Sequence, residues 1–352
     1  MLTVILGAGA SYDSDPADPP APNRTRPKRP PLSNQLFADR FGYAVDRYRA
    51  CRPLIHDLRR LPEGASIEEE LDRLTQKAEA GGGDLRLRRQ LMAIRYYLAD
   101  VISRSTREWS AEFYGVTNYS ILANRLDAWA TSAGERILWV DFNYDSLLEE
   151  GLTDVTGFQD HELAGYVGSL ERHVVVKPHG SANWIHVATD DDPQINYQGS
   201  GEWISQLVVD RLSHITIGTE FVVGNWLHAS GKPAVPAITI PIREKVAFEC
   251  PQDQLDALGD GLAKTGRLLV IGWAANEENF LALCRQKLKG PYRVQIVCGG
   301  AKESNDTSRM LQSRMVGGQH FTSEKGFSDF LASQELDWLL GEDPGLGKPR
   351  PL

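Results

Sequence analysis

The sequence predicts an α/β fold in which a parallel sheet carries helices on both faces and a helical segment is inserted into the core. Short apolar runs alternate with helical patterns in the second half of the chain, which is typical of strands buried on both faces of a parallel sheet. Four clusters of glycine and polar residues each follow the end of such a run. Because open parallel sheets bind ligands at the carboxyl ends of their strands, we expect these clusters to converge on one site.

The bulk composition is that of a folded globular protein. The chain has 352 residues, of which 41% are hydrophobic, enough for one large domain or two ordinary ones. Charged residues make up 24%, close to the globular average. The net charge of −9 argues against a chain that coats nucleic acid by bulk electrostatics, so we expect no direct nucleic-acid binding.

The cysteine pattern and the hydropathy indicate a compartment. The four cysteines are not spaced as CxxC pairs, which argues against a four-thiolate zinc site; they are Cys51, Cys250, Cys284 and Cys298. A disulfide framework is not expected at this length, which indicates a reducing environment. The first apolar run is too short for a signal peptide, and no stretch approaches the roughly 18 apolar residues of a membrane helix. We therefore expect a cytoplasmic protein with no zinc or other metal and no membrane-spanning segment.

The N-terminal run VILGAGAS, residues 4–11, ends a predicted strand and begins a helix. Residues 13–31 follow it and contain seven prolines and few apolar side chains, so they cannot form a helix or a central strand. A loop of this length beside a ligand site is often a lid, and the alternative is a plain insertion. Its basic cluster at residues 24–29 either touches phosphate or an acidic protein, or is simply solvated.

Residues 33–133 show a helical pattern, with apolar residues three and four apart. We interpret this region as a helical insertion that divides the core into residues 1–32 and 134–310. Residues 311–352 are expected to form a C-terminal helical tail.

Strand signals return after the insertion. Apolar runs predict strands within residues 136–145, 173–181, 215–218, 237–241, 267–280 and 292–300. A helical pattern lies between the last two runs, at about residues 277–288. We assign these strands to the parallel sheet.

The glycine turn at residues 7–11 allows close backbone approach and offers amides at a helix start, as a phosphate site requires. The alternative is a tight strand–helix turn with no ligand. The dinucleotide fingerprint GxGxxG is incomplete, no acidic residue stands at a strand end about 20 residues on, and GxxxxGK[ST] is absent. An ordinary dehydrogenase and a P-loop ATPase are therefore not supported.

Two later turns carry candidate catalytic side chains. Asn143 and Asp145 share the turn FNYDS, where an Asn amide can donate to a ribose hydroxyl and accept from a water. The alternative is an Asx-type turn or helix cap, with Asp145 capping the next helix. The turn KPHGS carries His179, which is suited to proton transfer near neutral pH, although a lone histidine is more often structural.

The fourth cluster, IGWAANEENF, pairs a glycine turn with two asparagines. Gly272 and Trp273 stand at its start, and Asn276 and Asn279 follow. It suits contact with adenine or ribose, or another helix cap.

In this order, the four clusters resemble the sirtuin-like superfamily (silent information regulator two type), in particular the sirtuin-like NADase domains of prokaryotic antiphage defence systems. The family's opening GAGxS resembles Gly7-Ala8-Gly9-Ala10-Ser11, and its TxNxD segment resembles Phe142-Asn143-Tyr144-Asp145. Its HG turn is similar to His179-Gly180, and its late GxSxxDxNF-like turn is similar to residues 272–280. The stretch PAITIPIREK, ending at Lys245, also resembles a segment of these defence domains.

The resemblance implies a Rossmann-like NAD-binding core and an NAD+ hydrolase that releases nicotinamide and ADP-ribose. It implies catalytic roles for Asn143, which would hold the ribose or the attacking water, and for His179, which would act as a base. The implied NAD-binding residues are Gly7, Ala8, Gly9, Ala10, Ser11, Asp145, Gly272, Trp273, Asn276 and Asn279. NAD+ is then the substrate and no cofactor is implied.

The departures from deacetylating sirtuins also resemble the defence branch. Deacetylating sirtuins carry a zinc module with two CxxC pairs, which this sequence lacks. A constitutive NADase would poison its host, so the resemblance implies a homo-oligomer switched on by a separate partner, such as a DNA-translocase-type ATPase or an Argonaute. The open alternatives are a non-catalytic module that binds NAD or ADP-ribose, and a protein deacylase or ADP-ribosyltransferase.

Overall fold

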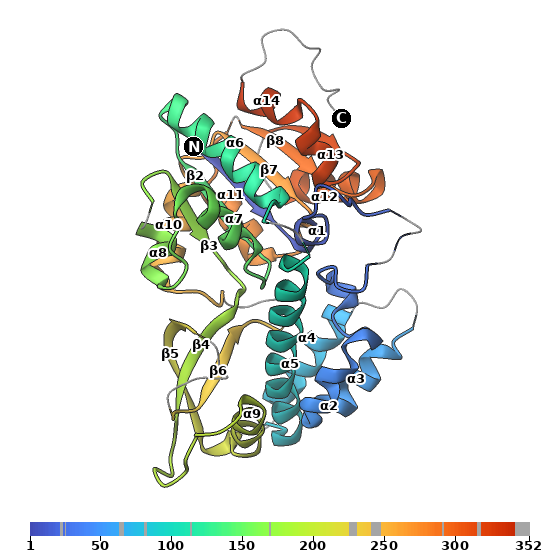
Figure 1. The fold of residues 1–352 in the computed structure, drawn as a ribbon, viewed down its shortest axis with the longest axis vertical. Coiled ribbons are helices and arrows are strands. Elements are labelled where there is room, and N and C mark those ends of the chain that lie inside the picture. Colours follow the sequence, from blue (N-terminus) through green and yellow to red (C-terminus); the bar gives the residue numbers. More distant parts are fainter. Residues whose placement is uncertain are drawn as a thin grey trace.

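A computed structural model gives the fold of the chain (Figure 1). It describes residues 1–341 apart from 22–23, 25, 63–66, 81–82, 113–114, 169, 225–230, 241–247, 291 and 315–317. Lys245 and the end of the expected tail, residues 342–352, lie outside the described residues.

The larger sheet has six parallel strands. They are β1 (Leu2–Leu6), β2 (Ile137–Asp141), β3 (His173–Val176), β7 (Arg267–Ile271), β8 (Arg293–Val297) and β9 (Gln319–Ser323). Their order is β3-β2-β1-β7-β8-β9, so the chain moves outward in one direction from β1 and in the other from β7. This is the order of the doubly wound Rossmann fold, with its switch point between β1 and β7. The predicted α/β class with a Rossmann-like parallel sheet is confirmed.

Helices cover both faces of this sheet because successive side chains of each strand point to opposite faces. Val4, Trp139 and Leu269 belong to one hydrophobic layer, whereas Val140 and Val270 belong to the other. The first layer is covered by α6 (Asn118–Ala133), α7 (Leu147–Thr156), α13 (Phe327–Ala332) and α14 (Glu335–Leu340). The second layer is covered by α10 (Gln252–Leu262), α11 (Glu278–Lys287) and α12 (Ala301–Arg314), and α8 (Leu163–Gly168) lies beside β3.

A separate hydrophobic core joins the N-terminal helices to a three-stranded antiparallel sheet of order β5-β4-β6. Its strands are β4 (Gly180–Asp190), β5 (Ile215–Val223) and β6 (Ala234–Ile238). Its helices are α2 (Gly42–Arg47), α3 (Arg52–Arg59), α4 (Ile67–Glu79), α5 (Leu85–Ser110) and α9 (Gly201–Asp210). The short 3-10 helices are η1 (Ser33–Gln35), η2 (Asp39–Phe41), η3 (Arg49–Cys51) and η5 (Leu212–His214). This region forms the lower half of Figure 1.

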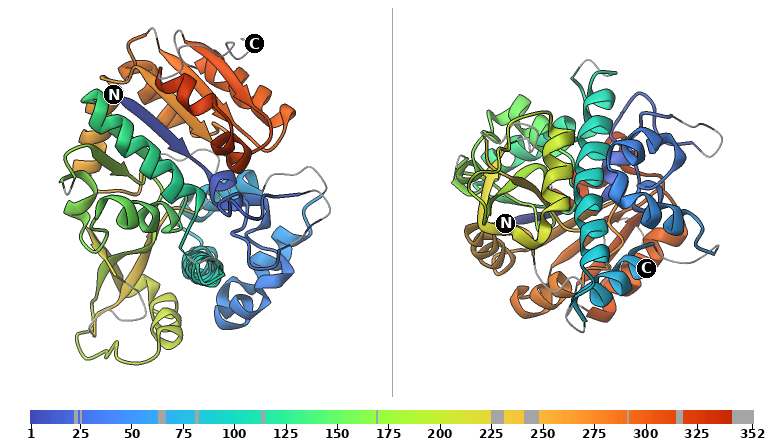
Figure 2. Two further views of the ribbon diagram at one scale, coloured as in Figure 1. Left: turned by 45° about the horizontal axis from the view of Figure 1, so that its top comes forward. Right: turned by 90° about the horizontal axis from the view of Figure 1, so that it is seen from below.

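Helix α5 links the two regions. Its 26 residues extend about 39 Å at the usual helical rise, and its start is capped by Asp84, which accepts the N–H of Leu87 at 3.1 Å. Seen from below in Figure 2, it runs between the other N-terminal helices and the antiparallel sheet. Its C-terminal half reaches the carboxyl ends of the larger sheet's strands. The short helix α1 (Ala8–Tyr12) follows β1 at this edge of the sheet. Helix α5 therefore supplies one wall of the site described below.

The structure departs from the expected domain boundaries in three places. Helix α6 packs on the larger sheet, although we assigned residues 33–133 to one insertion. Strands β4, β5 and β6 form an antiparallel sheet against α5. We assigned residues 215–218 and 237–241 to the parallel sheet, because an apolar run carries no signal of strand direction, and we predicted no strand over most of β4. Residues 311–352 contain β9, which we missed because this edge strand, QHFTS, has Phe321 as its one large apolar residue.

Candidate functional site

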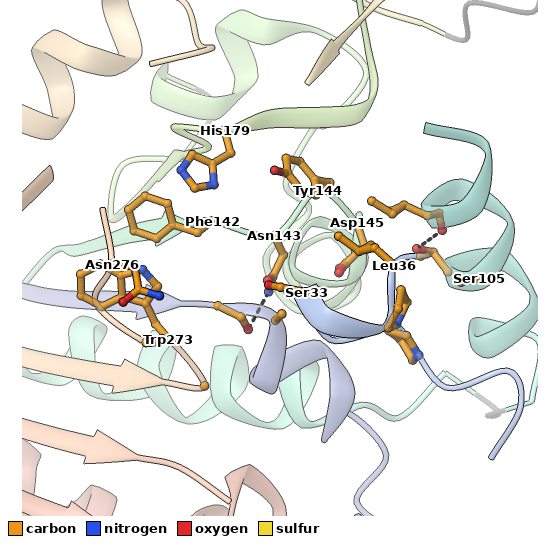
Figure 3. A pocket seen from close by; sticks show the side chains of 18 of the residues that line it. Ser33, Leu36, Ser105, Phe142, Asn143, Tyr144, Asp145, His179, Trp273 and Asn276 are labelled. Atoms are coloured by element: carbon orange, nitrogen blue, oxygen red, sulfur yellow. Dashed lines mark hydrogen bonds between the residues drawn. The ribbon is translucent and has the colours of Figure 1, made fainter. Parts of the chain in front are cut away.

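The predicted clusters meet in a pocket of about 130 Å³ at the C-terminal ends of β1, β2 and β7, beside the switch point (Figure 3). The predicted residues that line it are Gly7, Ala8, Asn143, Asp145, His179, Gly272, Trp273 and Asn276. The opposite wall comes from the proline-rich loop, η1 and α5, through Pro30, Pro31, Ser33, Leu36, Ile102, Ser105 and Thr106. The structure thus brings Asn143 and His179 to one pocket beside the glycine turn.

Four predicted NAD-binding residues lie outside this pocket. Gly9, Ala10 and Ser11 follow Gly7 into α1 and do not line it. Asn279 is exposed on α11, also away from the pocket. The spacing of a turn places its first residues at the strand end, but the helix that follows turns the later ones away.

The glycines interlock the ends of β1 and β7. The N–H of Gly7 donates to Ile271 O at 3.0 Å, and the N–H of Gly9 donates to Gly272 O at 3.0 Å. A Cβ on Gly7 would lie 2.6 Å from Gly272 O, and one on Gly272 would lie 2.3 Å from Ala10 N. Small residues are therefore needed for the two backbones to meet, and the amides of Gly7 and Gly9 serve the fold, not a phosphate.

Asn143 is clasped by the glycine turn. Its Nδ2 lies 3.1 Å from Gly7 O, 3.1 Å from Ser11 Oγ and 3.2 Å from Tyr119 Oη. Its backbone N–H donates to Asp141 Oδ1 at 3.1 Å. The side chain's donors are thus engaged within the protein, and its Oδ1 is the atom that can accept a hydrogen bond from a ligand.

Ser11 and Tyr119 support Asn143 from behind. Ser11 is 2% exposed, and its Oγ lies 2.8 Å from Tyr119 Oη. Burial raises the pKa of the Tyr119 phenol well above its ordinary value, so the hydroxyl stays protonated. The sequence analysis missed Tyr119, which comes from α6 and stands in a helical pattern with no signal beyond that of a core residue. Ser11 therefore positions Asn143 and does not face the pocket.

His179 lies in the loop between β3 and β4, where it is buried among aromatic rings. Its ring centroid is 4.8 Å from that of Phe142 and 6.1 Å from that of Tyr144. Its carbonyl accepts the N–H of Thr239 at 3.0 Å. Gly180 has a φ of +77° and would place a Cβ 1.9 Å from Ala237 O, so only glycine fits after His179. The loop thus directs the imidazole at the pocket, as Figure 3 shows.

Asp145 lines the pocket and also shapes its own turn. Its Oδ1 accepts the N–H of Leu147 at 3.1 Å, which is an Asx-type turn leading into α7. The Asx-type turn that we gave as the alternative role of Asp145 is therefore present, and the residue also lines the pocket.

Trp273 contributes an aromatic floor. Its ring stacks on Phe142 with centroids 5.2 Å apart and planes 5° apart, and its Nε1 donates to Glu277 Oε2 at 2.6 Å. Asn276 is exposed at the rim of the same pocket. The fourth cluster therefore supplies a flat apolar surface and a polar rim.

Below the turns that carry Asn143 and His179 lies a buried charge cluster that the sequence analysis did not identify. Lys177 is fully buried, 3.1 Å from Asp141 Oδ2 and 2.9 Å from Glu149 Oε1. Burial raises the pKa of Asp141 to about 7, against the opposing effect of Lys177. Burial also raises the pKa of Glu149. The available signal was the placement of charged residues at the ends of fully apolar runs.

Three arginines of the basic cluster contact one carboxylate of the same proline-rich loop. Arg24 and Arg26 lie 2.5 and 2.6 Å from the carboxylate of Asp18, and the buried Arg29 lies 3.5 Å from it. This single carboxylate offsets one of the three positive charges, so the arginines keep a net positive charge. The loop's end, residues 30–31, forms part of the pocket wall.

A second, larger hollow of about 480 Å³ adjoins the pocket. The two share Thr106, Tyr144 and Asp145, and polar side chains from α5, α7 and β4 line the rest. Within the described part of the chain, no three His, Cys, Asp or Glu side chains group as a metal site. None of the helices in the described ranges combines the length and apolar character needed to cross a membrane.

Comparison with known proteins gives structural matches alone: no protein-family model and no curated protein matches the chain. One match is the crystal structure of Sir2 with the inhibitor EX-527, 2′-O-acetyl-ADP-ribose and a deacetylated p53 peptide, at 12% identity and a TM-score of 0.38, covering 97% of this chain and 95% of that one. A second is Sir2 with a p53 peptide and NAD+, at 13% identity and a TM-score of 0.37, covering 96% and 93%. A third is a Sir2 homologue–NAD complex, at 11% identity and a TM-score of 0.32, covering 89% and 88%.

Proposed function

We propose that this protein is an NAD+ hydrolase that releases nicotinamide and ADP-ribose. The observation that carries the proposal is that the imidazole of His179 and the carboxamide of Asn143 line one pocket with Gly7 and Ala8. That pocket lies at the switch point of a doubly wound sheet, where such sheets bind nucleotides. The resemblance of the four sequence clusters to the sirtuin-like NADase domains supports the same assignment.

The side chains suit cleavage of the bond between nicotinamide and ribose. Nicotinamide leaves as a neutral molecule with the bonding electron pair, and the ribose carbon passes through a state with oxocarbenium character. Asn143 Oδ1 accepts from a ribose hydroxyl or from the attacking water, because its Nδ2 is engaged by the protein. The water oxygen bonds to that carbon, and His179 takes its proton and passes it to solvent. The main catalytic contribution of these side chains is therefore to hold the ribose and the attacking water in the reactive orientation.

The size of the pocket says what it accepts in this conformation. A volume of about 130 Å³ is close to that of a cavity that binds one benzene molecule. It fits a single ring, and the adjoining hollow of about 480 Å³, which shares Thr106, Tyr144 and Asp145 with the pocket, offers space for more of the dinucleotide. We propose the proline-rich loop as the gate, since residues 30–31 lie in the wall.

We further propose that the enzyme is the effector of an antiphage abortive-infection system. Uncontrolled NAD+ hydrolysis would kill the host cell, so activity must depend on a homo-oligomer or on a separate activating partner, such as a DNA-translocase-type ATPase or an Argonaute. The site would then act in the cytoplasm, where NAD+ is abundant.

A module that binds NAD or ADP-ribose without turnover is the second candidate. The observation that favours it is the engagement of Asn143 Nδ2 by Gly7, Ser11 and Tyr119, which leaves a single acceptor atom for the ligand. Deacylation or ADP-ribosylation of proteins has less support, because the sequence lacks the paired CxxC motifs that build a zinc module.

The test measures nicotinamide release from NAD+ by the purified protein, with and without the product of the neighbouring gene. We expect turnover that His179→Ala and Asn143→Ala each lower by at least about 100-fold. Asn279→Ala is the matched control, since it removes an asparagine from the same predicted set that lies outside the pocket. Tight NAD+ binding without products would favour the binding module. Label transferred from NAD+ to protein would favour ADP-ribosylation of proteins. Equal activity of Asn143→Ala and Asn279→Ala would contradict the proposed site.

A further inference from the structure

We propose that Lys177 is a positioning residue for this reaction: it locks the turn that carries Asn143 to the turn that carries His179. The catalytic meaning of this role rests on the NAD+ hydrolysis proposed above, whereas the contacts described next do not.

Lys177 is fully buried between the two turns, and its ammonium group has three acceptors. Nζ lies 3.1 Å from Asp141 Oδ2 and 2.9 Å from Glu149 Oε1. It also donates to the backbone carbonyl of Asp145 at 2.6 Å. Each of the three ammonium protons thus has a partner. The partners belong to the end of β2, to the turn after it and to α7, so one side chain holds three consecutive parts of the chain.

The same cluster reaches both catalytic residues through the backbone. Asp141 stands two residues before Asn143 and accepts its N–H at 3.1 Å through Oδ1, the oxygen that does not face Lys177. Lys177 stands two residues before His179, and its own N–H donates to Gln254 Oε1 at 3.0 Å. A change in the orientation of either turn therefore breaks a bond of this cluster, and each turn fixes the other.

Stability alone does not account for a charged cluster here. Replacing a buried ion pair by apolar side chains of similar volume is often neutral or stabilising. This cluster has one cation and two carboxylates, and Glu149 Oε2 is buried without a hydrogen-bond partner among the described residues. Its ion pairs and hydrogen bonds are directional, as apolar contacts are not, and directional contacts are what the placement of two catalytic turns requires.

The cluster also gives a measurable pH response. Burial and the neighbouring carboxylates raise the pKa of Asp141 to about 7, and burial raises the pKa of Glu149. The other titratable groups that face the cluster are Asp145, Tyr119 from α6 and Tyr166 from α8, whose hydroxyl lies 3.2 Å from Glu149 Oε1. Burial raises the pKa of both tyrosines, so the carboxylates take up the proton near neutral pH.

The test compares Lys177→Met and Glu149→Gln with His173→Leu, which alters a buried polar group at the other end of β3. For Lys177→Met we expect kcat to fall by about 100-fold with KM changed less than about threefold, as misplacement by about 1 Å produces. Hydrogen exchange of the Asn143 amide should accelerate in the same variant. For Glu149→Gln we expect a folded enzyme in which the contribution of Asp141 to the pH profile moves to lower pH, because one of the carboxylates that raise its pKa is gone. His173→Leu should lose stability while each folded molecule keeps its kcat.

Each outcome decides one part of the proposal. Unchanged kcat and unchanged exchange at Asn143 in Lys177→Met would overturn it, as would an unchanged pH profile in Glu149→Gln. If Lys177→Met does not fold, exchange of the Asn143 amide in Glu149→Gln, which removes the charge of one of the three acceptors of the ammonium group, decides instead. If the unaltered protein releases no nicotinamide even with its partner, hydrolysis fails, and the exchange rate of the Asn143 amide still decides whether Lys177 holds the turn.

Discussion

The two ends of β3 carry buried polar groups of opposite character. At the start of the strand, His173 Nδ1 accepts from Trp139 Nε1 at 3.1 Å and Nε2 lies 3.0 Å from Asp127 Oδ1. Both ring nitrogens are satisfied by the neutral imidazole, and burial lowers the histidine's pKa. At the other end, Lys177 faces two carboxylates, and Glu149 Oε2 is buried with no hydrogen-bond partner in the part of the chain that the structure describes.

On the positioning role proposed for Lys177, this difference separates a polar group that serves the fold from one that serves a site. A neutral, fully hydrogen-bonded group costs little once buried. A buried cluster with excess negative charge costs stability and shifts pKa values, and proteins tolerate such clusters chiefly where they function. Both ends of β3 thus bury polar groups, and the group that costs stability lies at the end beside the pocket.

The largest expected effect is on the free energy of unfolding, and it distinguishes a glycine beside the pocket from one away from it. Gly272 beside the pocket and Gly157 at the end of α7 both have positive φ, +61° and +71°. A Cβ on Gly272 would lie 2.3 Å from Ala10 N, whereas one on Gly157 would have no atom of the described residues within 4 Å. We expect Gly272→Ala to lower the free energy of unfolding by at least about 3 kcal/mol, and Gly157→Ala by about 1 kcal/mol. Urea denaturation measures both, and equal losses would show that the interlock of β1 and β7 contributes nothing.

A smaller effect is expected at Tyr119, which supports Asn143 from α6. Tyr119→Phe removes the hydroxyl that contacts Ser11 Oγ and Asn143 Nδ2, so kcat should fall about tenfold as the carboxamide loses its fixed orientation. Tyr96→Phe is the matched control, because Tyr96 is equally buried and donates to Ala234 O at 2.6 Å within the other core. Both variants should lose about 1–2 kcal/mol of stability. A Tyr96→Phe variant that loses as much kcat as Tyr119→Phe would remove the distinction.

The sequence predicted which residues come together better than it predicted what they do. Gly7, Asn143, His179 and Gly272 meet because parallel strands present their carboxyl ends at one edge, and a strand end is visible in a sequence. The roles of Ser11 and Asn279 were not predictable in this way. A helical turn carries Ser11 behind Asn143 and leaves Asn279 outside the pocket, and that rotation depends on packing.

The residues that support Asn143 and His179 stand in sequence patterns that are typical of ordinary core residues. Tyr119 lies in an amphipathic helical pattern, and its contact with Asn143 depends on how α6 crosses the sheet. Lys177 and Asp141 stand at the ends of apolar runs, where a charge was visible but its partner was not. Strand direction was likewise not readable, so β5 and β6 were assigned to the wrong sheet, and most of β4 was not predicted as a strand.

The smallest expected effect is a pH response of opposite sign at the two ends of β3. The pKa of Asp141 is raised in the folded state, to about 7, so its contribution to stability is present below about pH 4 and is lost as pH rises through 7. The pKa of His173 is lowered below its ordinary 6.5, so its contribution is present above that value and is lost as pH falls.

The two responses overlap in pH, since that of Asp141 lies between about pH 4 and 7 and that of His173 lies below about pH 6.5, so variants are needed to separate them. Urea unfolding between pH 6 and 8.5 measures both, and each is on the order of 1 kcal/mol over that range. Glu149→Gln should weaken the fall in stability between pH 6 and 7, because Lys177 then pairs with Asp141 without a competing carboxylate and the pKa of Asp141 falls. His173→Leu should remove the rise in stability up to about pH 6.5. If Glu149→Gln altered this rise, or His173→Leu the fall, the two ends of β3 would be coupled, and the charged cluster would be part of the general framework of the fold instead of a device of the pocket.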